Sequence, residues 1–499
     1  MLLTAIWVLP VLAAALLSIE WVPRRLTRPL GLLVSLVVLV LTVVVAVQLA
    51  PGHHGYQFEV NLPWIPQYSI AYHLGVDGIS VWLVVLNAFL TVIAIAVAGG
   101  QLRRQRGFIA LVLLQEGAMA GAFLAADLLL FYVFWEGMLI PAYFLLWLWG
   151  EGDRPAWAAL KFVLYTLAGS LLMLVGVIAE YVFAGGGTHT FDMAKLAAAP
   201  PSQAVQFGLF LLFGIAFAIK IPLFPFHSWL PDAYGSAPAA YLVTFAGVMG
   251  KVGAYAMLRI LVPLFPHPQL WWNWNDVVPV LAVLGIVWGA LMALAQRDMK
   301  LVVAYSSVSH MGFIVLGIFS FTQQGQQGAV LQMVNHGIIV PALFLLVAWV
   351  AARTGTRDRS VLKDLAPRMP VMAGVFMVVT LAALGLPGLN SFVGEFMTLL
   401  GAWHFSPWLA AAGAIGLVLA PLYMLRLFQG VMYAGPGEDP PPGHAPGWVR
   451  TVTRLPDLAG VEVGVMVPLV ALMFLLGLYP ALLTSVMTAL GYPLPVPWK

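Results

Sequence analysis

Apolar runs of about 20 residues recur along the whole of this 499-residue sequence, and they constrain its fold more than any other feature. The chain is 62% hydrophobic and only 9% charged, whereas soluble domains carry about 25% charged residues. So few charged residues cannot cover a surface that faces water. The runs have the length of membrane helices and lack the alternating pattern of membrane β-strands. We therefore predict an all-α integral membrane protein.

Fourteen membrane spans are predicted from these runs. They cover residues 2–19, 29–50, 79–99, 108–126, 128–149, 158–183, 206–230, 237–262, 276–296, 300–321, 328–352, 370–402, 407–430 and 461–489. The run 370–402 is too long for one straight crossing. No Lys or Arg precedes the first apolar run, so we expect it to be a retained span and not a cleaved signal peptide.

The basic residues support this span count. Of 23 Lys and Arg residues, eighteen fall in loops after odd-numbered spans and two lie within spans. Three lie on the opposite side, namely Lys195, Arg259 and Lys499. Because cytoplasmic loops carry the excess of Lys and Arg, both termini are expected on the non-cytoplasmic side. With basic residues confined to short loops and a net charge of +3, we expect no nucleic acid partner.

The predicted spans form two blocks of five, 108–262 (spans four to eight) and 263–430 (spans nine to thirteen). Three helices precede them in 1–107, and a flexible Pro/Gly-rich loop and a last helix follow in 431–499. An odd number of spans turns the second block upside down relative to the first. We therefore predict two inverted five-helix repeats.

Each block contains one interrupted span, the fourth in both cases. Pro222 and Pro225 break the first, and Pro387 and Gly388 break the second. Proline removes a backbone donor, and in lipid the freed carbonyl groups need protein, water or an ion as partners. Paired breaks at corresponding positions are typical of inverted-repeat transporters. The alternative is that both are kinks without a function.

Ionisable residues at membrane depth are costly and need a reason. The candidates are Glu116, Glu136, Glu180, Lys220, Lys251, His310, His336, Glu395 and Glu462. Most basic residues are arginines, yet two of the few lysines, Lys220 and Lys251, lie deep in spans. Arginine keeps its proton, whereas a desolvated lysine can lose it. These two lysines therefore indicate groups that take up and release protons.

Glu136 and Lys220 are natural partners, one on span five and one at the break of span seven. Close together, each keeps the other ionised; apart, each tends toward neutrality. A pair that opens and closes would act as a proton switch, and the alternative is a static salt bridge between two helices.

His310 and His336 lie on adjacent spans and could relay protons. Packing by a hydrogen-bonded histidine is equally compatible with their spacing, and a haem site is disfavoured because the histidines are single. Glu180 and Glu462 lie near span ends and are expected at the interface. Glu116 lies deeper, and its role stays open. The chain has no cysteine, which excludes thiolate-ligated clusters on it.

Three stretches resemble a known family: "KIPLFPFHSWLPDAYGSAP" (220–238), "LVVAYSSVSHMGF" (301–313) and "LGLPGLNSFVGEF" (384–396). They are similar to the antiporter-like membrane subunits of respiratory complex I, NADH:quinone oxidoreductase, and the similarity extends over all fourteen spans. The M type is the most similar, because an acid, Glu395, stands where sister subunits usually carry lysine. The chain also ends without the long lateral helix of the L type.

The resemblance implies that redox chemistry in other subunits drives proton translocation along buried Glu, Lys and His residues. The implied proton-transfer residues are Glu136, Lys220, Lys251, His310, His336 and Glu395, with Glu116 and His227 in support. It implies no metal and no cofactor on this chain, with NADH, FMN, iron–sulfur clusters and quinone in other subunits. The implied partners are neighbouring antiporter-like subunits, the lipid bilayer, protons and water, in a bacterial inner membrane.

Three alternatives remain at this point. A subunit of a multisubunit Na⁺/H⁺ antiporter, or of an energy-converting membrane hydrogenase, would share the same bundle and lysines. A scaffold, in which the polar residues only hold helices together, belongs to a different class. Normal activity after replacement of Lys251 would indicate the scaffold.

Overall fold

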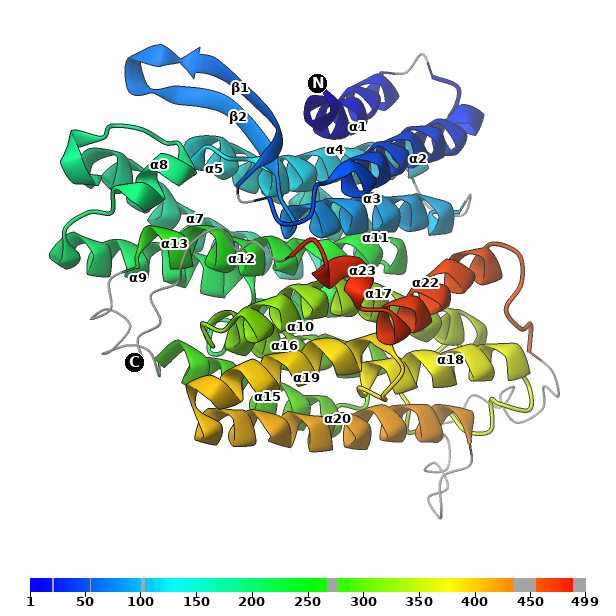
Figure 1. Cartoon of the computed structure of the whole chain (residues 1–499). Helices are drawn as coiled ribbons and strands as arrows, with labels where there is room; N and C mark the ends of the chain where they lie inside the picture. Colours follow the sequence, from blue (N-terminus) through cyan, green and yellow to red (C-terminus); the bar gives the residue numbers. More distant parts are fainter. Residues whose placement is uncertain (20–21, 54, 100–103, 267–276, 434–454, 488–499) are drawn as a thin grey trace.

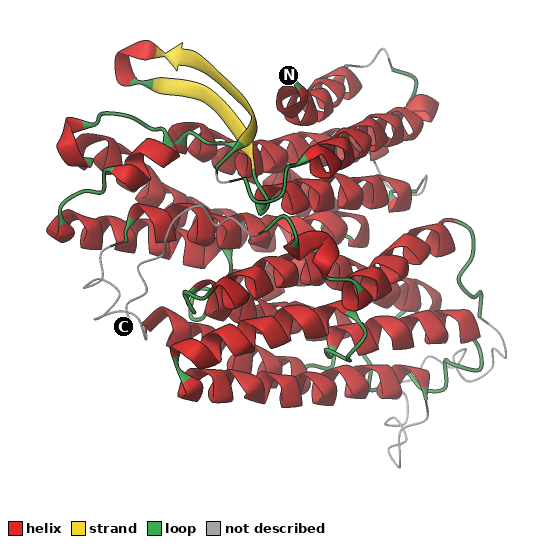
Figure 2. Cartoon of the chain, viewed as in Figure 1, coloured by secondary structure: helices red, strands yellow, loops and turns green. Residues whose placement is uncertain are grey.

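The computed structural model describes residues 1–19, 22–53, 55–99, 104–266, 277–433 and 455–487. Its helices lie side by side and roughly parallel, with one β-hairpin at an end of the bundle (Figures 1 and 2). In lipid an α-helix satisfies its own backbone groups, so each long apolar run forms one. Twelve described helices are long and apolar enough to cross a membrane, and Leu2–Ser18 and Pro370–Ala383 are shorter apolar helices. These segments correspond to the predicted spans.

The first three spans and the segments outside the membrane frame the bundle. The spans are α1 (Leu2–Ser18), α2 (Arg24–Gln48) and α3 (Ser80–Val97). The outer segments are β1 (Gln57–Ile65), η1 (Pro66–Tyr68), β2 (Ile70–Val76), η2 (Gly185–Gly187) and α8 (Met193–Ala198).

The first predicted block contains one helix that changes its hydrogen-bond register twice. Its elements are α4 (Gln105–Leu124), α5 (Leu128–Gly137), α6 (Leu139–Trp149), α7 (Pro155–Phe183), α9 (Gln203–Lys220), α10 (Trp229–Ser236), α11 (Ala239–Thr244), η3 (Phe245–Met249), α12 (Gly250–Ala256), η4 (Met257–Leu261) and α13 (Val262–Leu264). Of these, η3 and η4 are π-helical. π-Helical turns are rare in proteins, and those that do occur often lie at functional sites. The continuous span from α11 to α13 is buried along its whole length.

The second predicted block lies beside the first, and the last two helices pack against it. Its elements are α15 (Val277–Ala295), α16 (Met299–Ile318), α17 (Gln323–Thr354), α18 (Pro370–Ala383), α19 (Asn390–Phe405) and α20 (Pro407–Met432), followed by α22 (Val461–Leu478) and α23 (Ala481–Thr484). Helix α17 contacts α11 and η3 of the first block and α19 of the second. It therefore connects the centres of the two blocks.

Both predicted helix breaks are confirmed. Helix α9 ends at Lys220 and α10 begins at Trp229, with Pro222 and Pro225 between them. At this break Trp229 donates its indole N–H to the carbonyl of Ile219 at 2.9 Å, which satisfies a group that the break would otherwise leave free. The second break separates α18 from α19 and contains Pro387 and Gly388.

The hairpin of β1 and β2 was not predicted; it lies between the predicted spans 29–50 and 79–99. Its strands pair antiparallel, with Asn61 opposite His73 and Leu62 opposite Tyr72. Strand β2 also bridges to Ala125 through Leu74. The hairpin therefore lies against the junction of α4 and α5. Of the predicted flexible loop, residues 434–454 lie outside the described part of the chain.

Candidate functional site

Four of the predicted residues form a continuous buried row that crosses from the first block to the second. Nζ of Lys251 lies 2.8 Å from Nδ1 of His336. The His336 ring lies 5.6 Å, centroid to centroid, from the His310 ring. Nδ1 of His310 lies 2.9 Å from Oε1 of Glu395. All four residues are buried, and we call this row the polar axis.

Lys251 lies in α12, between the two π-helical segments. Besides its contact with His336, it donates to the carbonyl of Ala246 at 2.6 Å. Ala246 belongs to η3, where the shifted register leaves a carbonyl able to accept a side-chain donor. The distorted helix therefore supplies one partner of the lysine, and α17 supplies the other.

The far end of the polar axis is a hydrogen-bonded carboxylate at the second helix break. Oε1 of Glu395 accepts from Oγ of Ser391 at 2.9 Å and from Nε2 of Gln332 at 3.2 Å. Gly385, in the break, has φ +78°, and a Cβ there would lie 2.8 Å from Oε2 of Glu395. The break thus provides the space that the carboxylate occupies.

Sequence reasoning did not identify Ser391 and Gln332. Ser391 precedes Glu395 by four residues in α19, and Gln332 precedes His336 by four residues in α17. Residues four apart share one helix face. A search for polar residues at that spacing from each ionisable residue would have found both.

The other end of the site contains Lys220, which is buried at the end of α9. Its Nζ lies 5.0 Å from the ring centroid of Trp135, in cation–π geometry. Among the described residues no ion pair within 4.0 Å joins Lys220 to Glu136, although the charge of Glu136 acts on it. The structure therefore holds the predicted pair in its separated arrangement.

Lys220 lies close to the polar axis because of one glycine. A Cβ at Gly253 would be 3.1 Å from Cβ of Lys220 and 2.9 Å from Cγ1 of Ile221. Gly253 lies two residues from Lys251 in α12, so the absence of its side chain lets the break of α9 approach the helix that carries the second lysine.

The two supporting residues of the prediction lie outside this row. Glu116 is fully buried in α4, and neither of its carboxylate oxygens has a hydrogen-bond partner among the described residues. Nε2 of His227 accepts a hydrogen bond at 3.2 Å from the indole N–H of Trp288, which is an exposed residue of α15. The structure therefore does not bring His227 into the polar axis.

Two acids were expected near span ends, at the interface. Glu180 lies in the last turn of α7 and is fully buried within the protein. Glu462, in the first turn of α22, pairs with Arg353 at 2.6 Å and is partly exposed, as expected. Arg259 was assigned to a span end; it lies in η4, buried, and pairs with Asp77 at 2.8 Å. Within the described residues no group of three or more His, Asp or Glu side chains is placed to hold a metal ion.

Comparisons with known proteins agree with this geometry. Residues 125–420 match the family described as NADH:quinone oxidoreductase/Mrp antiporter, TM. The chain is 40% identical to NADH-quinone oxidoreductase subunit M of Mycobacterium tuberculosis over 96% of this chain and 91% of the relative. Subunit M of Escherichia coli K12 is 36% identical over 92% of this chain and 91% of the relative.

Solved structures share the fold. A chain of respiratory complex I from Thermus thermophilus with bound NADH has a TM-score of 0.85 and 34% identity, covering 98% of both chains. A chain of the Mrp complex from Dietzia sp. has a TM-score of 0.82 at 24% identity over 97% of this chain and 95% of that one, which shows the fold alone. The chain, matched along almost its whole length, belongs to the NADH-quinone oxidoreductase subunit M family.

Proposed function

We propose that this chain moves protons across the membrane along the polar axis, as the antiporter-like M subunit of NADH:quinone oxidoreductase. The observation that carries the proposal is the row from Lys251 through His336 and His310 to Glu395, all buried. Short contacts join its first two and its last two members, and the two imidazole rings between them lie 5.6 Å apart. Burying four ionisable groups is costly in a membrane, and a role in proton transfer accounts for the cost. Higher identity to subunit M than to the Mrp chain favours complex I over an antiporter.

Protons would enter at Glu136 and Lys220. When Glu136 approaches Lys220, the carboxylate favours the ammonium form; when the two separate, burial favours the neutral amine and the proton leaves. In the separated arrangement Nζ of Lys220 lies 5.0 Å from the ring centroid of Trp135, and no carboxylate of the described residues within 4.0 Å offsets the desolvation of its charge. The proton then passes by way of water to Lys251, which lies on the helix packed against Lys220 at Gly253.

From Lys251 the proton would pass to His336, on to His310 and then to Glu395. Imidazole suits this role because it accepts a proton at one nitrogen and releases one from the other. Glu395, which accepts from Ser391 and Gln332, is the last member of the row. The arginine-rich loops support a bacterial plasma membrane orientation with both termini on the non-cytoplasmic side. Redox cofactors belong to other subunits, and neighbouring antiporter-like subunits are the partners.

The test is replacement of Lys251 by methionine in the assembled complex. Methionine fills the space of lysine without a charge, so the fold should survive, since apolar residues often replace buried charges without loss of stability. We expect proton pumping, measured in proteoliposomes with NADH and quinone, to fall by about tenfold or more. The matched control is Lys161→Met, because Lys161 pairs with Asp232 at 2.6 Å outside the polar axis. Normal pumping in the Lys251 variant would overturn the proposal in favour of a scaffold.

A further inference from the structure

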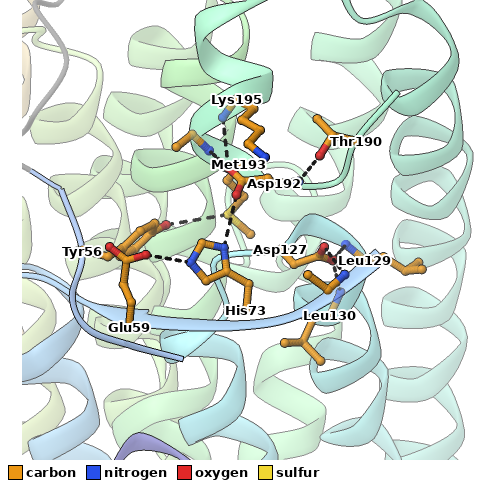
Figure 3. A network of polar contacts seen from close by, with 12 residues as sticks. Tyr56, Glu59, His73, Asp127, Leu129, Leu130, Thr190, Asp192, Met193 and Lys195 are labelled. Atoms are coloured by element: carbon orange, nitrogen blue, oxygen red, sulfur yellow. Dashed lines mark hydrogen bonds and ion pairs between the residues drawn. The ribbon is translucent and has the colours of Figure 1, made fainter. Parts of the chain in front are cut away.

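A second cluster of ionisable side chains lies at the end of the bundle that carries the hairpin (Figure 3). Nε2 of His73 lies 3.0 Å from Oε2 of Glu59, its neighbour in the hairpin. Nδ1 of the same ring lies 3.3 Å from Oδ2 of Asp192, which caps α8. His73 is only 4% exposed. One buried imidazole therefore joins the hairpin to α8, and we call these three residues the histidine clasp.

The geometry of the clasp fits the protonated ring. An imidazolium has two N–H donors, whereas a neutral imidazole has one donor and one acceptor. A carboxylate oxygen lies within 3.3 Å of each ring nitrogen: Nε2 is hydrogen-bonded to Glu59, and Nδ1 lies in a charge contact with Asp192 that lacks hydrogen-bond geometry. Both contacts are ion pairs only when the ring is protonated. Because the carboxylates lie at opposite nitrogens of one ring, they do not converge on a point where a metal ion could bind.

The clasp surrounds the start of the helix that carries Glu136. The carbonyl of His73 accepts from the N–H of Ala126 at 2.9 Å, and the N–H of Leu128 donates to the carbonyl of Phe191 at 2.7 Å. Asp127 accepts from the N–H of Ala71 at 3.2 Å and caps α5. The first residues of α5 are thus held between β2 and the segment before α8.

We propose that protonated His73 is a positioning residue that holds the start of α5, and through it Glu136, so that pumping depends on the pH at this end of the bundle. Glu136 follows Asp127 by nine residues, about 13 Å along the helix. Loss of one carboxylate contact frees the hairpin from α8 and loosens the start of α5. This inference rests on the role of Glu136 in the proposed function.

Other charged groups near the clasp already have partners. The Tyr56 ring lies edge-on to His73 at 6.2 Å, and the Arg259 guanidinium lies over that tyrosine, 4.7 Å from its centroid. Arg259 itself is paired with Asp77. The backbone N–H of Lys195 donates to Asp192, and Asp127 is occupied by backbone donors.

The direction of the pH effect follows from the clasp. Burial lowers the pKa of His73, but Asp192 and Glu59 outweigh it and raise the pKa above its ordinary value of 6.5. A group whose pKa is higher in the folded than in the unfolded protein stabilises the fold fully when the pH is below its unfolded pKa. That stabilisation is lost as the pH rises through its folded pKa. The clasp should therefore be closed at pH 6.5 and below and open on the alkaline side.

The experiment uses the assembled complex in proteoliposomes, with NADH outside and the internal pH set during reconstitution. Only complexes whose hairpin end faces the lumen react with external NADH. We expect the initial pumping rate to fall by about half or more as the internal pH rises through the pKa of His73. A fall in rate is the opposite of what the proton gradient alone would cause. An alkaline lumen lowers the free energy needed to pump protons into it and should speed pumping.

Two variants separate a titrating clasp from a structural contact. His73→Gln keeps a polar side chain but cannot titrate, so the internal pH dependence should disappear. Glu59→Gln removes one carboxylate and should shift the midpoint to lower pH by about 1 unit. A wild-type pH profile in His73→Gln, or an equal loss at every pH with no shift in Glu59→Gln, would overturn the inference.

A further measurement separates this inference from the proposed function. Hydrogen exchange of residues 126–131, corrected for intrinsic pH dependence, should lose protection above the midpoint in the wild type only. Normal pumping in Glu136→Gln would reject the proposed function while leaving the exchange result standing. A flat exchange profile would reject the clasp, whatever the pumping data.

Discussion

At the scale of single residues, the site is organised by partners that lie far apart in the sequence. Lys251 and His336 are 85 positions apart, and Gln332 and Glu395 are 63 apart. Composition and spacing identified the ionisable residues, because a charge within an apolar run is conspicuous in the sequence. They did not identify which residues touch, since contact depends on how α12, α17 and α19 pack. Glu136 and Lys220 illustrate this, because the sequence predicted a pair that can open or close but not that Nζ of Lys220 faces the ring of Trp135.

The first residue-scale prediction concerns Glu395. Glu395→Gln keeps the shape and the contacts with Ser391 and Gln332 but cannot carry a proton away. We expect the complex to assemble normally and pumping to fall by about tenfold or more. Proton uptake in proteoliposomes measures the effect, and Ser391→Ala, which removes one hydrogen bond to the same oxygen, should cost less. Equal losses in the two variants would indicate that hydrogen bonding, and not titration, is what matters at this position.

At the scale of elements, the two helix breaks could be predicted from the sequence. The two π-helical segments, η3 and η4, could not. Proline and glycine interrupt a helix for local reasons, so the sequence contains the signal for the ends of α9 and α18. A π-helical turn leaves no such signal, because its residues are as apolar as those of the neighbouring α-helix. The hairpin was missed because Pro63 interrupts the strand pattern of β1 and because both strands stand between long apolar spans. The fold of the bundle was therefore predictable, while the setting of Lys251 was not.

Substitution of two glycines at the second helix break, between α18 and α19, tests whether the space beside Glu395 is required. Gly385 and Gly388 both have positive φ, +78° and +94°, so alanine at either should cost about 1–2 kcal/mol of stability. A Cβ at Gly385 would also meet the Glu395 carboxylate, whereas one at Gly388 would have no described atom within 4 Å. We expect similar losses of thermal stability in the two variants but a larger loss of pumping in Gly385→Ala. Equal pumping in both would show that the space beside Glu395 is not required.

At the scale of the whole molecule, a buried ion pair joins the N-terminal spans to the first block. Asp77, just before α3, pairs with Arg259 of η4, and their side chains are 6% and 7% exposed. Charge counting assigned Arg259 to the side opposite the arginine-rich loops and did not identify its partner. Positive-inside reasoning still gave the right span count, since one residue among 23 does not alter the asymmetry.

Breaking this pair should destabilise the molecule as a whole. Asp77→Asn keeps the oxygen that accepts from the backbone of Ile79 and Ser80 but leaves Arg259 without a counter-charge. We expect a loss of about 3–5 kcal/mol, seen as a lower midpoint of thermal unfolding and a lower yield of assembled complex. The double variant Asp77→Asn/Arg259→Met should recover part of the loss. No recovery would mean that the aspartate acts mainly as a cap.

The indole ring of Trp135, beside Lys220, should report the charge of that lysine through its absorption and fluorescence. Trp135 lies 5.0 Å from an ammonium group that, in the proposed function, gains and loses its charge in each cycle. A charge at that distance shifts the absorption and the fluorescence of an indole ring through its electric field. The chain has 18 tryptophans, so a difference spectrum between the wild type and Lys220→Met is needed to isolate this one. The protein thus carries its own probe for following the charge state of a buried lysine during turnover.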